Sequence, residues 1–524
     1  MGDYKKFLLY VTVFICGLST MGVELSASRL LAPFFGASLF VWTNIIGIIL
    51  ISLSIGYFLG GRFADKHPNE TYFYTFSLIS GVLIGLIPLF SSFILPISVQ
   101  AIMTSSSNDF FLSLFACILL FSFPTIFLGA IVPYAIRINS KKIDGVGKTS
   151  GRIYAVSTTG SIIGVYLPSI FLIPLIGTQL TIIFFSLLLI IISFISLFFT
   201  KKIDFLKRIF SLIIVCIVLS VIFFIKYPTI AEIAENTIFN DKEIIYETET
   251  PYSYVFVAGS GERTYLKGRL AGGIWSLKID NKHFTNTYFD YPLVATSMNE
   301  NTENVLILGL GGGSCSNSFI HAYPDIQIDG VEIDPQVIEV GKKYFDMGEN
   351  NLNSIASDGR LFVKKTEKKY DIVFVDVYRD AYIPFHMATV EFFKEVRSIL
   401  NDDGCICINI VTYNQGTIDA VFNTIFEVFP SVYKLIPTYS HNTFLYASNQ
   451  QTDIDEIKQA VLTARDNIPF SEDVSNNEKI DLKLIFTDVH DKLEEYKKSD
   501  ESIFFTDDKV PIEYMIGMDA FPFG

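Results

Sequence analysis

Long apolar runs fill the first part of this chain and constrain its fold more than any other feature. They lie within the first 228 of 524 residues, and each is long enough to cross a bilayer as a helix. We expect seven spans, near residues 7–25, 39–59, 72–95, 110–136, 154–175, 178–199 and 208–226. Because backbone polar groups must find partners within lipid, residues 1–228 are expected to form a multi-pass α-helical membrane domain.

Charge divides the chain at the same place. Residues 1–228 carry 15 Lys and Arg against 7 Asp and Glu, a net +8, whereas the remaining residues carry 25 against 47, a net −22. In the apolar half, 13 of the 15 basic residues fall in alternate loops, which places the N-terminus in the cytoplasm. The acidic half is unsuited to nucleic acid, whose phosphates attract basic surfaces.

The six cysteines predict neither a disulfide framework nor a metal site. Three of them lie in apolar runs, and no CxxC pair occurs in the chain. Cys405 and Cys407 lie two residues apart on one expected strand, so they share a face but cannot easily bridge each other.

The acidic half alternates between strand and helix patterns. Residues 229–300 are expected to form a connector and a small antiparallel β domain, because hairpin signals separate their β-prone runs. Between residues 301 and 450, five apolar runs alternate with helical segments, which predicts a mostly parallel, Rossmann-like sheet of the class I methyltransferase type. Residues 451–524 are expected to form a C-terminal helical tail.

A glycine-rich turn follows the first strand of this sheet and is a candidate ligand site. The segment NVLILGLGGGS runs from a buried strand into a helix that begins near Ser314. Its turn holds the four glycines Gly309, Gly311, Gly312 and Gly313. Such a turn lets a ligand approach the backbone closely, and the helix N-terminus adds positive potential. An ordinary tight turn would show the same pattern.

Three acids at the ends of neighbouring strands favour a nucleoside-type site. Glu332 follows the glycines by about 20 residues, where a carboxylate can accept hydrogen bonds from both ribose hydroxyls. Asp358, with Gly359, could accept from an adenine amino group. Either acid could cap the following helix, and for Glu332 the capping and ribose-binding roles can coexist. Asp376 ends the run YDIVFVD. There a carboxylate can hold an ammonium group and take its proton as the amine attacks, or be a solvated strand end.

Distinctive motifs are spread along most of the chain: ELSASRLLAPFFG, GGRFAD, YETETPYSY, NVLILGLGGG, GVEID, SDGR, DIVFVD, IPFH and TDDKVPIEY. Together they resemble the spermidine synthase (polyamine aminopropyltransferase) family, and specifically its membrane-fused bacterial and archaeal branch. The resemblance implies decarboxylated S-adenosylmethionine as co-substrate, with Glu332 on its ribose and Asp358 on its adenine. It also implies Asp376 as the base that deprotonates the attacking amine, and methylthioadenosine as product.

The chain departs from the family pattern where the family contacts polyamines. Gly312 stands in place of an aspartate that holds the aminopropyl amine, and Asp290 stands within a replaced Tyr-His-Glu segment. Arg379 occupies the second aspartate of an Asp-Ser-Ser-Asp loop, unless Asp380 substitutes by a one-residue shift. The candidate substrate-binding residues are Asp290, Tyr378, Arg379, Asp380 and Pro384.

Three functions are compatible with these residues. The first is a membrane-bound aminopropyltransferase that acts on a small amine or polyamine. The second is another transferase that uses S-adenosylmethionine, and the third is a transporter or sensor that binds a nucleoside or polyamine without turnover. The expected partners are the amine and the lipid bilayer of the plasma membrane, with a homodimer left open. Seven spans would place residue 229 outside the cell, whereas a cytosolic co-substrate requires it inside.

Overall fold

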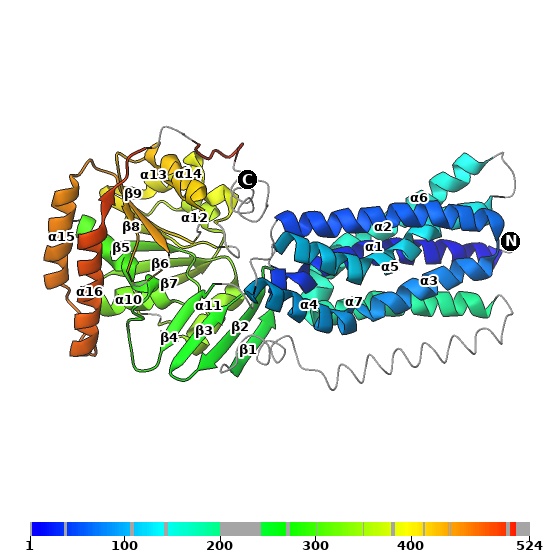
Figure 1. Ribbon diagram of the computed structural model, residues 1–524, viewed down its shortest axis with the longest axis horizontal. Helices are drawn as coiled ribbons and strands as arrows, with labels where there is room; N and C mark the ends of the chain where they lie inside the picture. The colour runs from blue at the N-terminus through cyan, green and yellow to red at the C-terminus, as the bar shows by residue number, and fades with distance from the viewer. Residues whose placement is uncertain are drawn as a thin grey trace. The chain divides into compact units, whose positions relative to one another are not determined.

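The computed structural model describes residues 3–35, 39–104, 109–140, 145–199, 243–268, 273–299, 301–348, 350–378, 383–411, 414–438, 440, 442–498 and 503–509. The chain divides into two compact units (Figure 1): Met1–Asn240 with Arg269–Ala271, and Asp241–Gly268 with Gly272–Gly524. The expected connector at 229–242 lies outside the described residues.

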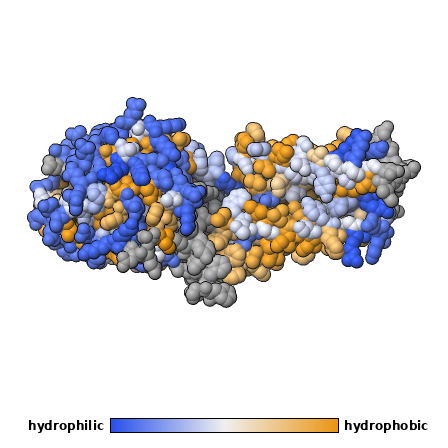
Figure 2. All heavy atoms as spheres, turned by 90° about the horizontal axis from the view of Figure 1, so that it is seen from above, coloured by the Kyte–Doolittle hydropathy of each residue, from blue (hydrophilic) through white to orange (hydrophobic). Residues whose placement is uncertain are grey.

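The first unit is a bundle of apolar helices. Its elements are α1 (Asp3–Phe35), α2 (Leu39–Lys66), α3 (Glu70–Gly85), α4 (Ile87–Thr104), α5 (Asp109–Asn139), α6 (Val146–Leu167), the π-helix η1 (Pro168–Leu172) and α7 (Ile173–Phe198). Glycines let α1 and α6 approach closely, because a Cβ at Gly160 or Gly164 would lie 2.2 Å from a carbonyl oxygen of α1. Apolar side chains dominate the outer surface of this unit (Figure 2), as expected of helices that face lipid.

The structure does not confirm the expected count of seven spans. Among the described residues, four helical stretches are long and apolar enough to cross a membrane, or up to five if the bent pair α3 and α4 counts as one span. The expected span at 72–95 is broken at Leu86 with a bend of 45°. Pro88 follows in the first turn of α4, where its missing N–H removes no hydrogen bond within the helix. The runs at 154–175 and 178–199 form one stretch that is kinked at Gly177. The run at 208–226 lies outside the described residues.

The second unit opens with the expected small antiparallel sheet. Strands β1 (Glu243–Glu249), β2 (Tyr254–Ser260), β3 (Arg263–Lys267) and β4 (Ser276–Ile279) pair in sequence order. A hairpin turn at Gly261, with φ of 57°, joins β2 to β3. The 3₁₀ segment η2 (Tyr288–Met298) then leads into the large sheet.

The large sheet has the expected mostly parallel, Rossmann-like core. Its strands are β5 (Asn304–Leu308), β6 (Gln327–Glu332), β7 (Leu352–Ala356), β8 (Tyr370–Val375), β9 (Leu400–Ile410), β10 (Ser431–Leu435), β11 (Thr443–Ser448) and β12 (Glu494–Glu495). Their order is β12-β10-β11-β9-β8-β5-β6-β7, in which β9 to β7 are parallel neighbours and β10, β11 and β12 are antiparallel. In such sheets, right-handed crossover connections join the parallel strands, which agrees with the alternation of strands and helices along the sequence.

Helices cover both faces of this sheet (Figure 1). They are α10 (Ser314–Ala322), α11 (Pro335–Tyr344), α12 (Gly359–Lys365), η3 (Phe385–Met387), α13 (Val390–Ile399), α14 (Gln415–Phe426), α15 (Ile454–Asp466) and α16 (Asn476–Lys492). In β5, Ile307 packs into the core under α15 and α16, whereas Leu306 packs into the core under α13 and α14. Successive strand residues point to opposite faces of the sheet. Because helices cover both faces, β5 requires an uninterrupted apolar run. The helical tail thus packs into the same core as the sheet.

Candidate active site

The glycine turn lies against the backbone of Asp376. Gly309, Gly311 and Gly313 have φ of 89°, 55° and 90°, a region that L side chains rarely adopt. A Cβ on Gly309 would lie 2.2 Å from the carbonyl oxygen of Asp376. Gly312 has an ordinary φ, and its N–H donates to Oγ of Ser276 at 2.7 Å. The turn from β5 to α10 is therefore built for close approach of two backbones.

Glu332 at the end of β6 holds this turn in place. One carboxylate oxygen accepts from the N–H of Gly311 at 3.0 Å, and the other accepts from the N–H of Asp334 at 3.2 Å. Burial raises the pKa of Glu332, and these hydrogen bonds oppose that rise. The capping of α11 falls to Asp334, which accepts from the N–H of Gln336. Glu332 is thus not the helix cap that its position also allowed.

Asp358 caps helix α12. Its Oδ1 accepts from the N–H of Leu361 at 2.9 Å, and its Oδ2 lies 3.4 Å from Nε2 of His386. The backbone N–H of Ser357 donates to the carbonyl oxygen of Glu332, which joins the two strand ends. Gly359 is the first residue of α12, where a Cβ would meet Cε of Met387 at 2.9 Å. The capping role is therefore present, and a contact to adenine stays a prediction.

Asp376 follows β8 and is oriented by an asparagine from the next strand. Asn409 on β9 donates from Nδ2 to Oδ1 of Asp376 at 2.8 Å. Asn409 is itself fixed, since its Oδ1 accepts from Asn442 at 2.9 Å and its carbonyl accepts from the hydroxyl of Tyr378 at 2.5 Å. Burial raises the pKa of Asp376 to about 7, and the Asn409 hydrogen bond opposes the rise. A carboxylate with such a pKa can take up a proton near neutral pH.

Two tyrosines lie close to this carboxylate. Burial raises the pKa of Tyr288 and of Tyr378, and the negative charge of Asp376 raises both further. Tyr378 is held by the N–H of Val411, which donates to its hydroxyl at 2.8 Å. Tyr288 donates to the carbonyl of Ile274 at 2.8 Å. Both phenols therefore stay neutral beside Asp376, and Tyr288 and Asn409 are neighbours that the sequence patterns did not single out.

Asp290 and Pro384 are the other predicted substrate contacts that lie within the described residues. Asp290 is 0% exposed, and accepts from the N–H groups of Thr285 and Asn286 and from the hydroxyl of Ser318. Burial raises its pKa to about 6. Asp290 thus fixes the turn before η2 onto α10, a structural role. Pro384 accepts the N–H of Met387 at the start of η3. Arg379 and Asp380 lie outside the described residues.

The predicted ligand residues occupy four adjacent positions along one edge of the sheet. In the order β8-β5-β6-β7, the residues that follow or end these strands are Asp376, the glycine turn, Glu332 and Asp358. The carboxyl ends of parallel strands form the ligand-binding edge of such sheets. This edge can therefore present a row of backbone N–H groups flanked by three acids.

Comparisons with known proteins point to one family. The family model described as spermine/spermidine synthase domain matches residues 291–459. A protein of Bifidobacterium longum, described as "Probable polyamine aminopropyl transferase", is 30% identical over 292 residues, which are 54% of this chain and 64% of that protein. The polyamine aminopropyltransferase of Vibrio vulnificus is 27% identical over 264 residues, 47% of this chain and 83% of its own length.

A further relative extends the similarity to the apolar half. Polyamine aminopropyltransferase 2 of Aquifex aeolicus is 26% identical over 472 residues, 86% of this chain and 89% of that protein. An alignment of that length includes the helical unit as well as the sheet. The chain is therefore similar over most of its length to a polyamine aminopropyltransferase, and its residues 291–459 match a spermine/spermidine synthase domain.

Proposed function

We propose that this protein transfers an aminopropyl group from decarboxylated S-adenosylmethionine to a small amine. The observation that carries the proposal is the row formed by Asp376, the glycine turn, Glu332 and Asp358 along one sheet edge. The family relationship supports the same chemistry. Glu332 binds the ribose hydroxyls of the donor, Asp358 its adenine, and the glycines let its sulfonium end lie against the backbone.

In the reaction, Asp376 acts as the general base. The amine nitrogen attacks the carbon next to the sulfonium sulfur, so a C–N bond forms while the C–S bond breaks. The electron pair of the broken bond stays on sulfur, and methylthioadenosine leaves. The proton lost by the amine passes to Asp376, whose pKa of about 7 suits a group that must accept it near neutral pH. Asn409 keeps the accepting carboxylate in one orientation.

One observation favours a second donor, S-adenosylmethionine itself. The family's aspartate for the aminopropyl amine is replaced by Gly312, and Ser276 and Phe345 lie within 3.2 Å of where its Cβ would be. Decarboxylated S-adenosylmethionine lacks the carboxylate that S-adenosylmethionine carries. Without an acid at position 312, nothing at that point repels such a carboxylate from the N-terminus of α10. Methyl transfer to an amine is therefore the alternative reaction.

A single product analysis separates the two reactions. Full-length protein, purified in detergent, is incubated with each donor and a series of diamines and polyamines. Aminopropyl transfer releases methylthioadenosine, whereas methyl transfer releases adenosylhomocysteine. Formation of neither product, together with donor binding in calorimetry, would indicate a binding protein and contradict both proposals. The variant Asp402→Asn, at an exposed acid of the sheet, is the control for loss of charge.

We also propose that the helical unit is embedded in the plasma membrane. The long apolar helices and their apolar outer surface support this, and the N-terminus is proposed to be cytoplasmic from the loop charges. A cytosolic donor requires the transferase domain to face the cytoplasm. Protease treatment of intact cells and of inverted vesicles tests this, since cleavage between residues 243 and 509 only in inverted vesicles places the domain inside.

A further inference from the structure

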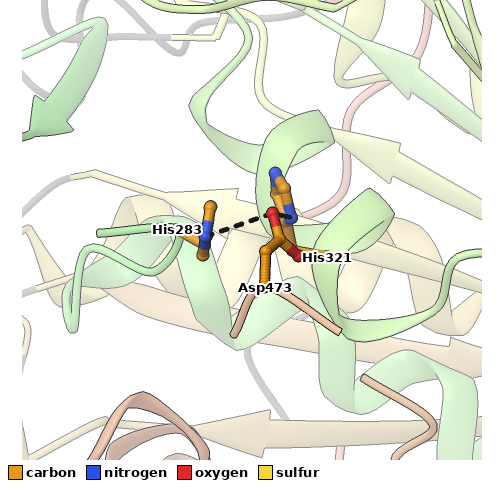
Figure 3. Close-up of side chains that lie close together, drawn as sticks. All are labelled: His283, His321 and Asp473. Atoms are coloured by element: carbon orange, nitrogen blue, oxygen red, sulfur yellow. Dashed lines mark ion pairs between the residues drawn. The ribbon is translucent and has the colours of Figure 1, made fainter. Parts of the chain in front are cut away.

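Two histidines and an aspartate meet at a point away from the transferase site (Figure 3). His283 lies in the loop after β4, His321 in the last turn of α10, and Asp473 in the loop between α15 and α16. The glycine turn precedes the first residue of α10, whereas His321 lies near its last. Because a helix rises about 1.5 Å per residue, the cluster is roughly 10 Å along the helix from the glycine turn.

The nitrogen–oxygen distances between the two histidines and Asp473 match the spacing of metal ligands, and Nδ1 of His321 also lies within hydrogen-bond distance of Oγ of Ser471, at 3.1 Å. Nε2 of His283 and Nδ1 of His321 lie 3.4 and 3.5 Å from Oδ2 of Asp473. An N–H···O hydrogen bond is shorter, about 2.7–3.2 Å. Ligands at about 2.0–2.1 Å from a zinc ion are about 3.3 Å apart when arranged as a tetrahedron. The ligand atoms of all three residues lie within 4.8 Å of one another.

The segments that carry these side chains are held together by other contacts. The N–H of Ser471 donates to the carbonyl of His321 at 2.8 Å, and the N–H of Phe470 donates to the carbonyl of Ala322 at 3.0 Å. The N–H of His283 donates to Oε1 of Glu478 at 2.7 Å. These bonds fix the backbone around the cluster, so an ion would find the three ligands already close. Pre-organisation of this kind lowers the entropic cost of binding.

The cluster is also open to solvent. The side chains of His283, His321 and Asp473 are 27%, 26% and 55% exposed. The two imidazole rings are stacked with 3.9 Å between their centroids, and a nitrogen of each ring lies close to the carboxylate of Asp473 (Figure 3). Water can therefore reach the cluster and complete a coordination shell.

We propose that His283, His321 and Asp473 bind a divalent transition-metal ion of the Zn²⁺ type, with water as the remaining ligand. Two imidazole nitrogens and one carboxylate oxygen are ligands that zinc accepts, whereas Ca²⁺ and Mg²⁺ prefer oxygen ligands alone. The bound ion cross-links the loop between α15 and α16 to α10 and to the segment before η2. Its role is to fasten the C-terminal helices to the sheet, and it does not depend on the transferase reaction.

Metal binding by the full-length protein tests this proposal. The protein is prepared with an affinity tag that lacks histidine, stripped with a chelator and titrated with Zn²⁺ and with Co²⁺. We expect one ion per chain, Co²⁺ absorption typical of tetrahedral coordination, and a thermal midpoint that rises when Zn²⁺ is added. His283→Gln, His321→Gln and Asp473→Asn should each weaken Zn²⁺ binding by at least about 100-fold, since each removes one of three protein ligands.

Two further variants make the result decisive. His490→Gln removes an imidazole whose Nδ1 lies 2.8 Å from Asp491 on the surface, and this control should leave Zn²⁺ affinity unchanged. His283→Cys supplies another zinc ligand, so it should restore binding where His283→Gln loses it and so exclude misfolding as the cause. Equal Zn²⁺ affinity in the wild type and the three ligand variants, or no uptake by the wild type, would overturn the proposal.

Discussion

The ionisation of Asp376 gives the sharpest prediction, because it links the structure to a measurable pH dependence. Burial raises the pKa of this carboxyl from 3.8 to about 7. At about 1.4 kcal/mol for each pH unit, the difference corresponds to about 4 kcal/mol in favour of the neutral acid. A base must be ionised to accept a proton. We therefore expect kcat/KM to fall tenfold for each pH unit below about 7.

Two variants change this profile in different ways. Asp376→Asn removes the proton acceptor, and we expect kcat to fall by about 10²–10⁴-fold, the usual contribution of a general base. Asn409→Ala removes the hydrogen bond that favours the carboxylate. Since a hydrogen bond to a charged group contributes about 1.5–3 kcal/mol, the acidic limb of the profile should move to higher pH by about one to two pH units. A merely structural asparagine would not shift it.

Protein stability provides an independent check on the same group. Because the folded-state pKa of Asp376 is raised, the folded protein binds more protons than the unfolded chain between about pH 4 and 7. Ionisation of Asp376 therefore costs stability as pH rises through this window. At pH 8, the free energy of unfolding of Asp376→Asn should exceed that of the wild type by up to about 4 kcal/mol, and the variant should unfold at a higher temperature. This difference should vanish below about pH 4.

The assay is the release of methylthioadenosine between pH 5.5 and 9 over a range of amine concentrations, which gives both kcat/KM and kcat at each pH. The acceptor amine has its own ionisation near pH 10, so its effect falls outside the limb assigned to Asp376. Asp402→Asn, at an exposed position, serves as control. A flat profile between pH 6 and 8, or an Asp376→Asn variant that keeps more than a tenth of the wild-type rate, would refute the reasoning.

Three further predictions concern the site and its supports. In thermal denaturation, Gly309→Ala should lower the free energy of unfolding by at least about 2 kcal/mol, because Gly309 has a φ of 89° and an added Cβ would lie 2.2 Å from a backbone oxygen. The control Gly348→Ala should not lower it, because there is open space around the added Cβ. Glu332→Gln should raise the donor KM about 10- to 100-fold in steady-state kinetics with a smaller change in kcat, while the exposed Glu339→Gln leaves it unchanged. In the same unfolding assay, Arg360→Met should lower the free energy of unfolding by about 2–4 kcal/mol, because Arg360 is 8% exposed and pairs with Glu395 and Asp507. An equal decrease in Arg465→Met, whose partner Asp466 is exposed, would contradict this prediction.

The strands and the acids at their ends were predictable from the sequence. The run that precedes Asp376 is a continuous apolar segment, as a strand covered on both faces requires, whereas Asp329 and Gly330 interrupt the run that precedes Glu332. In a parallel sheet, residues that end such strands must lie at one edge. Local pattern and general geometry therefore placed both acids beside the glycine turn without reference to other contacts.

Contacts between distant segments were not predictable in this way. Asn409 orients Asp376 only because β9 is the neighbour of β8, and Asp290 is buried only because α10 covers it with Ser318. Likewise, His283 and His321 meet Asp473 only after the C-terminal helices pack onto the sheet. A short segment carries no information about which strand, helix or loop will cover it.

The sequence alone determined the division of this protein into an apolar helical half and an acidic α/β half. It also determined that carboxylates follow the carboxyl ends of the parallel strands. These properties follow from hydrophobic periodicity, which each segment carries by itself. The tertiary structure decided the environment of each side chain: which acid is oriented as a base, which is buried as a support, and which imidazoles share a carboxylate. Desolvation and hydrogen bonding depend on neighbours that only the folded chain brings together.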